Sequence, residues 1–409
     1  MIEHFRRQID SIRHQTYANW FCIISDDCSK QEIFKHLQDV VHGDERFAFC
    51  RNSSNLGFYY NFERCLSYVP EDVSFVAFSD QDDYWHPDKL SVLVSTFDED
   101  TTLVYSDMNI VNEQGEVIHS TYWTTRKNNY TALDFLLFAN TITGAASMIR
   151  KDLVDYVLPF PKKIGDSYHD HWIGCIALSR GKVKYVKKPL YDYYQHSVNV
   201  LGHYTRSNEI SMRDLREAFK RLRSGIRSQE LLQYLKAVAW KSRDIYFNDI
   251  VRLILLAKVI LLRCGDISGR KKALLRQFVR FEKSISALFM QAVKGKVLKR
   301  STLGAESYCL RAAIVFKLMN VYMKMKKETY LQRCVGLLPM ENSHAGLKVQ
   351  GTGSLDIIKQ KTAPLVLAID PDASTSINMI IPTIDFKYFF GGYIGKFNLA
   401  LRLADAGLH

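Results

Sequence analysis

Short apolar runs alternate with segments of helical periodicity over the first 125 residues, and this alternation constrains the fold more than any other feature of the sequence. "FCIISDD" at 21–27 and "VSFVAFSD" at 73–80 have the composition of buried strands. A helical pattern precedes the first run, with Ile2, Phe5, Ile9 and Ile12 on one face, and another helical pattern follows each run. Strands that alternate with helices predict an α/β fold with a mostly parallel sheet.

Acidic residues gather where two of these strands end. Asp26 and Asp27 close the first run, and Asp80, Asp82 and Asp83 follow the second within "SDQDDYWHPDKL". In open α/β sheets, ligands bind outside the carboxyl ends of the strands, so both groups are expected at one site. Hard oxygen ligands favour Mg²⁺ or Mn²⁺. The alternative is a polar turn in which Asp83 or a neighbour caps the helix that begins near Pro87.

Positive charge is concentrated in one region. The chain of 409 residues has a net charge of +12, and residues 211–335 contain 28 Lys and Arg against nine Asp and Glu. Such a region suits a phosphate-rich partner, either nucleic acid or an anionic membrane surface. The helical segment 244–263 carries its polar residues on one side, which fits either an interfacial helix or a helix packed on the neighbouring domain. We therefore consider peripheral membrane contact through residues 240–300.

Cysteine spacing and hydropathy bear on the compartment. The eight cysteines form no close CxxC pair, and no apolar run is long enough for a transmembrane span. The sequence also shows no secretory leader. A cytoplasmic protein with reduced thiols is expected.

Four stretches in order resemble the family 2 glycosyltransferases, which have the GT-A fold. They are "SIRHQTYANWFCIISDDCS", "FSDQDDYWHPDKL", "HDHWIG" and "PLYDYYQHSVNVLG", and the resemblance covers about residues 1–203. Within the family, the chain is most similar to bacterial rhamnosyltransferases that build surface polysaccharides. Residues 376–409 resemble the first β-loop-α unit of a GT-B glycosyltransferase.

The resemblance implies roles for individual residues. Asp27 would contact the nucleobase of the donor, while Asp80 and Asp82 form the DxD motif that holds a divalent cation and the ribose. Asp83 would share that task. Asp170 would be the general base that deprotonates the acceptor, and His196 would lie near the diphosphate or the metal. From the residues alone, Asp170 also fits a helix N-cap and His196 an ordinary hydrogen-bonded histidine.

The implied activity is inverting transfer of a sugar, with rhamnose from dTDP-rhamnose favoured, assisted by Mn²⁺ or Mg²⁺. The acceptor would be a lipid-linked glycan of O-antigen or capsule assembly at the inner face of the plasma membrane. Such a transfer needs a carboxylate base and a cation that stabilises the departing diphosphate. One alternative is a catalytically impaired remnant that binds donor or scaffolds partners. Another is a nucleic-acid-binding protein, but the sequence shows no such module and we expect no nucleic-acid partner.

Two departures from the family pattern affect the expected organisation. The family begins with a strand and a nucleotide-contacting loop, whereas this sequence begins at the following helix. We therefore expect an N-terminally truncated GT-A domain at 1–210, a basic helical region at 211–335, a linker at 336–375 and a partial GT-B domain at 376–409. The second departure is Tyr194 in "YYQH", where the family pattern places an arginine. Its absence puts one contact to the donor diphosphate in doubt.

Overall fold

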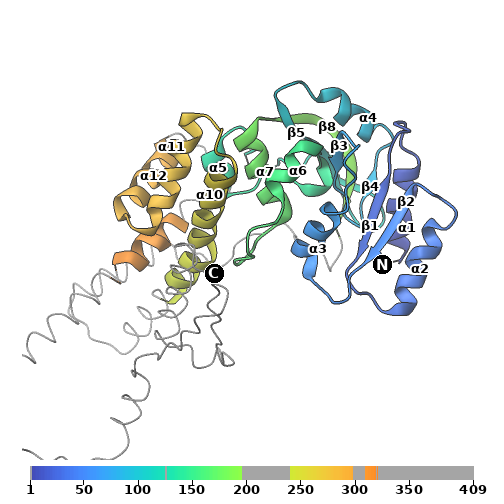
Figure 1. The fold of residues 1–409 in the computed structure, drawn as a ribbon, viewed down its shortest axis with the longest axis horizontal. Coiled ribbons are helices and arrows are strands. Elements are labelled where there is room, and N and C mark those ends of the chain that lie inside the picture. Colours follow the sequence, from blue (N-terminus) through green and yellow to red (C-terminus); the bar gives the residue numbers. More distant parts are fainter. Residues whose placement is uncertain (1, 125–126, 196–239, 298–308, 319, 321–409) are drawn as a thin grey trace, which may run out of the picture. The chain divides into compact units, whose positions relative to one another are not determined.

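The computed structural model describes residues 2–124, 127–195, 240–297, 309–318 and 320 (Figure 1). The chain divides into two compact units, residues 1–337 and 338–409, and all the described residues belong to the first. His196, the proposed linker at 336–375 and the GT-B-like segment 376–409 lie outside the described residues. The domain boundaries expected at 210 and 335 also fall there, so they stay predictions.

A two-stranded parallel sheet forms the N-terminal part of the fold. Strand β1 (Cys22–Asp26) pairs with β2 (Phe47–Arg51), with Cys22 opposite Phe47 and Asp26 opposite Arg51. Helices α1 (Ile2–Arg13) and α2 (Gln31–Val41) cover one face through a small apolar cluster, and α3 (Gly57–Leu66) packs against β1. These elements follow the predicted alternation because each helix has one apolar face to bury.

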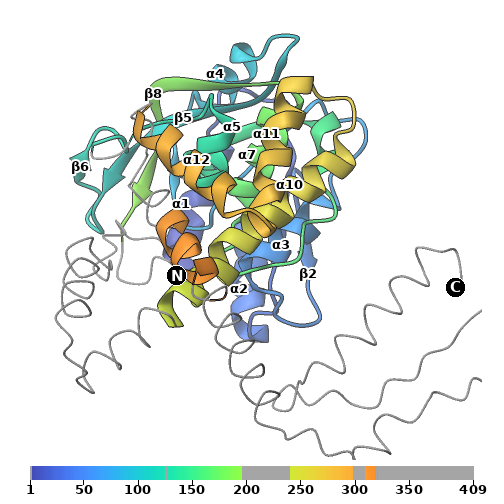
Figure 2. The same ribbon diagram turned by 90° about the vertical axis from the view of Figure 1, so that its left-hand side faces the viewer.

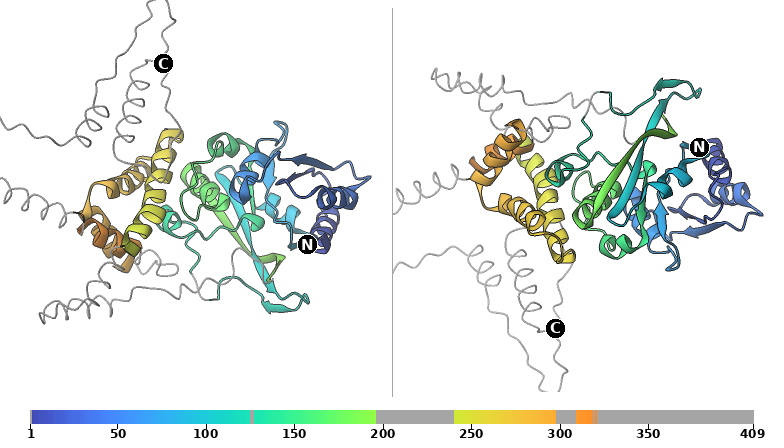
Figure 3. Two further views of the ribbon diagram at one scale, coloured as in Figure 1. Left: turned by 90° about the horizontal axis from the view of Figure 1, so that it is seen from below. Right: turned by 90° about the horizontal axis from the view of Figure 1, so that it is seen from above.

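A second sheet of six strands has the order β3-β7-β5-β8-β4, with β6 paired to the outer part of β5. Its strands are β3 (Phe75–Ala77), β4 (Tyr84–Trp85), β5 (Thr101–Val111), β6 (Val117–His119), β7 (Ser147–Arg150) and β8 (Lys182–Tyr194). Among the described strands of this sheet, β5–β8 is the one parallel pair, and the long strands run side by side in both views of Figure 3.

The expected α/β class is confirmed, but the mostly parallel pairing is wrong because the larger sheet is mixed. The difference arises at β7, which lies antiparallel between β3 and β5. Antiparallel pairing needs no helical crossover, so a strand after a short 3-10 turn can enter the sheet without the βαβ alternation. That turn, η1 (Gly144–Ala146), directly precedes β7.

Four helices complete the α/β part. They are α4 (Lys89–Thr96), α5 (Leu133–Phe138), α6 (Val154–Val157) and α7 (His169–Arg180). Helix α7 is buried along nearly its whole length, and its residues Trp172, Ile173 and Ile176 are almost inaccessible to solvent. Because α7 is enclosed on all sides, it gives rigid support to Asp170 in its first turn.

The described basic region is helical, as expected, and packs on the α/β part. After a π-helical turn (Tyr246–Ile250) come α10 (Val251–Arg263), α11 (Gly269–Val279) and α12 (Ile285–Val297). Figure 2 shows these helices against α5 and α7, and the contacts of α10 with both agree. The interfacial interpretation of 244–263 is therefore wrong for α10, since Leu253, Leu256 and Ile260 belong to the common core. Among the described helices, none has the length and apolar character that a membrane crossing requires.

Candidate functional site

The acidic loop, residues 80–83 between β3 and β4, is hydrogen-bonded to α1. The Nη2 of Arg7 donates to the backbone carbonyl of Asp82 at 2.7 Å. Two residues beyond the loop, the backbone N–H of Trp85 donates to the hydroxyl of Ser11 at 3.0 Å. Gln15 then donates to the carbonyl of His86 at 2.8 Å. Polar side chains of the first helix and of the residues just after it thus fix the backbone of the loop and of the two residues that follow it.

The carboxylates of this loop repel one another. Burial, then the charges of Asp82 and Asp170, raise the pKa of Asp80 to about 7. Burial, then Asp80 and Asp82, raise the pKa of Asp83 well above its usual value. The Oδ2 atom of Asp83 is buried and has no hydrogen-bond partner in the described residues. Crowded carboxylates of this kind become favourable when a cation neutralises them.

The chemistry of this donor set fits a divalent cation. Carboxylate oxygens suit Mg²⁺ or Mn²⁺, and Mg²⁺ in particular is held by one or two protein carboxylates together with substrate phosphates and water. Within the described part of the chain, no three His, Cys, Asp or Glu side chains already surround a single point as a complete metal site. The loop can therefore supply part of a coordination shell, and the remainder would come from a phosphate ligand.

Asp170 lies in the first turn of α7 and is oriented by two backbone N–H groups. His171 donates to its Oδ1 at 2.6 Å, and Gly144 of η1 donates to its Oδ2 at 3.2 Å. The N-cap position itself belongs to Tyr168, so the alternative of Asp170 as the N-cap is wrong. A carboxylate in the first turn still benefits from the positive end of the helix dipole. Because its charge raises the pKa of Asp80, Asp170 belongs to the same site as the acidic loop.

The histidines beside Asp170 are buried. His169 stacks on Phe62 with ring centres 3.6 Å apart, and burial lowers its pKa to about 3. His171 contacts the Leu136 carbonyl through Nε2 at 2.8 Å, and burial lowers its pKa to about 4. Both rings are therefore neutral at physiological pH, and neither adds a positive charge to neutralise the acids.

Asp27 has a different environment. Its Oδ1 accepts from the backbone N–H of Leu56 at 2.7 Å and from the Asn52 amide at 3.0 Å, and its Oδ2 accepts from the N–H of Gly57 at 2.8 Å. The carboxylate thereby closes the loop before α3 and satisfies backbone donors at the start of that helix. The nucleobase contact expected of Asp27 stays a prediction.

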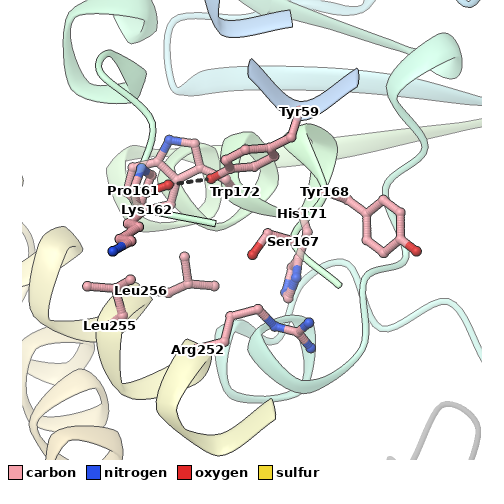
Figure 4. A pocket seen from close by; sticks show the side chains of 10 residues that line it. All are labelled: Tyr59, Pro161, Lys162, Ser167, Tyr168, His171, Trp172, Arg252, Leu255 and Leu256. Carbon is pink, nitrogen blue, oxygen red and sulfur yellow. Dashed lines mark hydrogen bonds between the residues drawn. The ribbon is translucent and has the colours of Figure 1, made fainter. Parts of the chain in front are cut away.

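A pocket opens between α7 and α10, beside but not at the acids (Figure 4). It is lined by Tyr59, Pro161, Lys162, Ser167, Tyr168, His171, Trp172, Arg252, Leu255 and Leu256. The Tyr59 hydroxyl donates to the Pro161 carbonyl across one wall at 3.0 Å. None of the predicted site residues lines it. The chemistry therefore points to the acidic loop and Asp170 rather than to this hollow.

The structure brings together four of the predicted residues, Asp80, Asp82, Asp83 and Asp170. Sequence reasoning missed two cations beside them. The guanidinium carbon of Arg7 lies 3.3 Å from the ring centre of Tyr194, so a cation stands beside the position where the family arginine was expected. The other is Lys89, which begins α4 with no exposed surface. The only sequence signal for Lys89 was its place four residues after Trp85, at the start of the helix that follows the acidic loop.

Comparison with known proteins gives one family match and two relatives of similar sequence. Residues 3–158 match the model of glycosyl transferase family 2. The protein named as a colanic acid biosynthesis glycosyl transferase, WcaA, of Escherichia coli (strain K12) is 31% identical over 113 residues, which are 27% of this chain and 39% of that protein. Protein CgeD of Bacillus subtilis (strain 168) is 26% identical over 190 residues, 42% of this chain and 40% of that protein. The chain thus spans about two fifths of the length of these relatives.

Solved structures give distant similarities. The structure of S. aureus TarS residues 1–349 in complex with UDP-GlcNAc has a TM-score of 0.42 at 13% identity, covering 78% of this chain and 88% of that one. The mannosyltransferase PcManGT of Pyrobaculum calidifontis, in complex with GDP-Man and Mn²⁺, has a TM-score of 0.37 at 16% identity, covering 78% and 84%. Residues 3–158, with their α/β fold, are therefore similar to glycosyl transferase family 2.

Proposed function

We propose that this protein transfers a sugar from a nucleotide sugar to an acceptor hydroxyl with inversion at the anomeric carbon. The observation that carries the proposal is the convergence of Asp170 with the acidic loop, because an inverting transfer needs a base for the acceptor and a separate anionic site for the donor's cation. Asp170 takes the proton of the acceptor hydroxyl. Its two backbone hydrogen bonds hold the carboxylate in one orientation while the proton moves.

Asp80 and Asp82 are the residues that would hold Mn²⁺ or Mg²⁺, with Asp83 at the buried end of the loop. When bound, the cation would stabilise the negative charge of the departing nucleoside diphosphate. The protein's own contribution is the fixed loop backbone, which α1 orients through Arg7 and Ser11. His196 near the diphosphate and Asp27 at the nucleobase complete the proposed donor site.

For the donor we favour dTDP-rhamnose, and for the acceptor a lipid-linked glycan in surface-polysaccharide assembly, of the O-antigen or capsule type. The family motifs support the donor assignment, and the similarity to a relative named for colanic acid biosynthesis supports the acceptor class. Such an acceptor is presented at the cytoplasmic face of the membrane, where we place the protein.

Membrane contact would involve α12 rather than α10. Four of its apolar side chains, Phe289, Met290, Val293 and Val297, are 44–70% exposed and lie on one helical face. We expect the protein to sediment with vesicles that contain anionic lipid and to be released by high salt. A Phe289→Ser and Val293→Ser double variant should bind the vesicles more weakly. Equal binding of the double variant would contradict this assignment.

Release of nucleoside diphosphate tests the proposed function directly. The protein is incubated with Mn²⁺, an acceptor extract and each of a panel of nucleotide sugars, with Asp170→Asn and Asp82→Asn in parallel. We expect release from one donor and its loss in both variants. Release that both variants retain would contradict the assigned roles, and silence with every donor would favour the impaired remnant.

A further inference from the structure

Lys89 is a fully buried ammonium group at the edge of the acidic loop. It begins α4 and has no exposed surface. Its Nζ lies 3.7 Å from the ring centre of Trp85 and 4.7 Å from that of Tyr191. Burying a charge costs free energy unless the charge is paired and hydrogen-bonded, so nearby groups must offset the cost of burying Lys89. The two aromatic faces compensate in part by attracting the cation.

The same ammonium group connects two parts of the site that are far apart in sequence. Its Nζ donates to the carbonyl of Ala145, the middle residue of η1. The preceding residue of that turn, Gly144, donates its N–H to the carboxylate of Asp170. The turn also fits tightly against α7, because a Cβ added at Gly144 would lie 2.5 Å from Nε2 of His169. A displacement of η1 is therefore transmitted to Asp170.

Lys89 also acts on the acidic loop through its charge. Its positive charge lowers the pKa of Asp80 and of Asp83, against the burial and the like charges that raise both. Burial in turn lowers the pKa of Lys89 itself, while Asp83 and Asp80 oppose that change. One side chain thus contacts the turn that orients Asp170 and attracts the carboxylates of the loop.

We infer that Lys89 is a positioning residue that fixes Asp170 and the acidic loop relative to each other. The inference rests on the proposed function and extends it, because Lys89 touches neither donor nor acceptor in that scheme. Misplacing a reacting group by about 1 Å costs on the order of 100-fold in rate. Loss of Lys89 should therefore reduce turnover while the donor-binding residues stay in place.

A second buried lysine provides a matched control. Lys151 is 9% exposed and pairs with Glu71 at 2.9 Å, in the same domain but outside the acidic loop. The experiment measures kcat, KM for the donor and the thermal unfolding midpoint of four proteins: the unaltered chain, Lys89→Met, Lys89→Arg and Lys151→Met. All rates are expressed per folded protein.

For Lys89→Met we expect kcat to fall about 100-fold and KM for the donor to change less than about threefold. Lys89→Arg, which keeps a cation between the two rings, should recover about tenfold of that loss. Lys151→Met should keep kcat within about threefold of the unaltered chain. If Lys89 had only a structural role, Lys89→Met would resemble Lys151→Met: the unfolding midpoint would fall in both. In that case kcat would not fall more than KM changes, and Lys89→Arg would not recover activity.

Three results would overturn the inference: a kcat for Lys89→Met close to that of the unaltered chain, equal losses in Lys89→Met and Lys151→Met, or no recovery in Lys89→Arg. If Lys89→Met does not fold, Tyr191→Leu tests the inference instead, because it removes one of the two rings beside the Lys89 ammonium. We then expect about a tenfold lower kcat, and a full rate would overturn the inference. An unaltered chain that releases diphosphate from no donor contradicts the proposed function itself, and the inference with it.

Discussion

Two pairs of neighbouring aspartates have different surroundings. Asp26 ends β1 and Asp27 follows it, whereas Asp82 and Asp83 lie in the loop between β3 and β4. Asp26 accepts from the Ser29 N–H at 3.1 Å and lies 3.2 Å from the Arg51 Nε, and Asp27 accepts three hydrogen bonds from its own loops. Asp83, in contrast, has a buried carboxylate oxygen without a partner.

The comparison separates carboxylates that the loops already hydrogen-bond from a carboxylate with a buried oxygen that has no hydrogen-bond partner in the described residues. Where the protein supplies the donors, the negative charge is already stabilised. Where burial and neighbouring carboxylates outweigh the charge of Lys89, as at Asp80 and Asp83, the pKa rises. The residue type is the same in both pairs, so the difference lies in the groups that surround each carboxylate.

The largest expected effect is on turnover. Asp82→Asn removes a charge from the acidic loop, and we expect kcat to fall about 1000-fold, or about 4 kcal/mol of transition-state stabilisation. Steady-state release of nucleoside diphosphate at saturating donor measures this. Turnover within tenfold of the unaltered chain would show that the two aspartate pairs do not differ as described.

The second prediction is that stabilisation by a cation depends on the aspartates of the acidic loop and not on Asp27. A ligand that binds only the folded state stabilises it by about 2.7 kcal/mol at 100 times its dissociation constant. We expect Mn²⁺ to raise the unfolding midpoint of the unaltered chain and of Asp27→Ala, and EDTA to reverse the increase. Asp82→Asn should lose the increase. An increase that survives in Asp82→Asn would place the cation elsewhere.

Asp27→Ala should act on stability instead. It leaves the Leu56 N–H without its acceptor, while the Gly57 N–H keeps only Oδ1 of Asn55 at 3.1 Å, and losing hydrogen bonds to a charged group costs roughly 2 kcal/mol. Urea unfolding measures this loss. The exposed Asp72→Ala is a control expected to change the free energy of unfolding by less than about 0.5 kcal/mol. Equal losses in the two variants would remove the structural role of Asp27.

The smallest effect concerns pH. The folded-state pKa of His169 is about 3, below the ordinary value of 6.5, so the unfolded chain binds more protons as the pH falls below 6.5. His169 therefore destabilises the fold by about 1 kcal/mol between pH 7 and pH 5.5. Asp80 acts in the opposite direction there, since its pKa of about 7 means that the folded state takes up the proton.

His169→Leu isolates the histidine contribution. Relative to the unaltered chain, this variant should gain about 1 kcal/mol of stability at pH 5.5 compared with pH 7. Urea unfolding at the two pH values measures the difference, with the exposed His14→Leu as the control. An unchanged pH dependence in His169→Leu would contradict the buried, neutral state of this ring.

Much of the first half of the fold was predictable from periodicity. The helix expected after the first apolar run is α2, and the strands ending at Asp26 and before Asp80 lie where the apolar runs indicated. The convergence of Asp80, Asp82, Asp83 and Asp170 was also expected. These elements could be predicted because the spacing of apolar residues along a helix or strand indicates which face is buried.

The remainder depended on contacts between distant segments. The position of β7 between β3 and β5 is set by pairing partners, which a single sequence does not indicate. Lys89 is a residue type that is almost never fully buried, so only the rings of Trp85 and Tyr191 reveal its place. The hydrogen bonds of Asp27 likewise come from Asn52, Leu56 and Gly57, which a loop sequence alone does not bring to one point.

The pairing of β5 with β8 has a consequence for biosynthesis. Thr101 of β5 lies opposite Lys182 of β8, and the two strands stay parallel to Val111 and Tyr194. During synthesis, β5 therefore leaves the ribosome well before β8, and the edge of β5 that pairs with β8 stays unpaired until then. Non-local pairing of this kind slows folding and exposes the nascent chain to association with its neighbours. The mixed sheet beside the acidic loop is therefore complete only after β8 has left the exit tunnel.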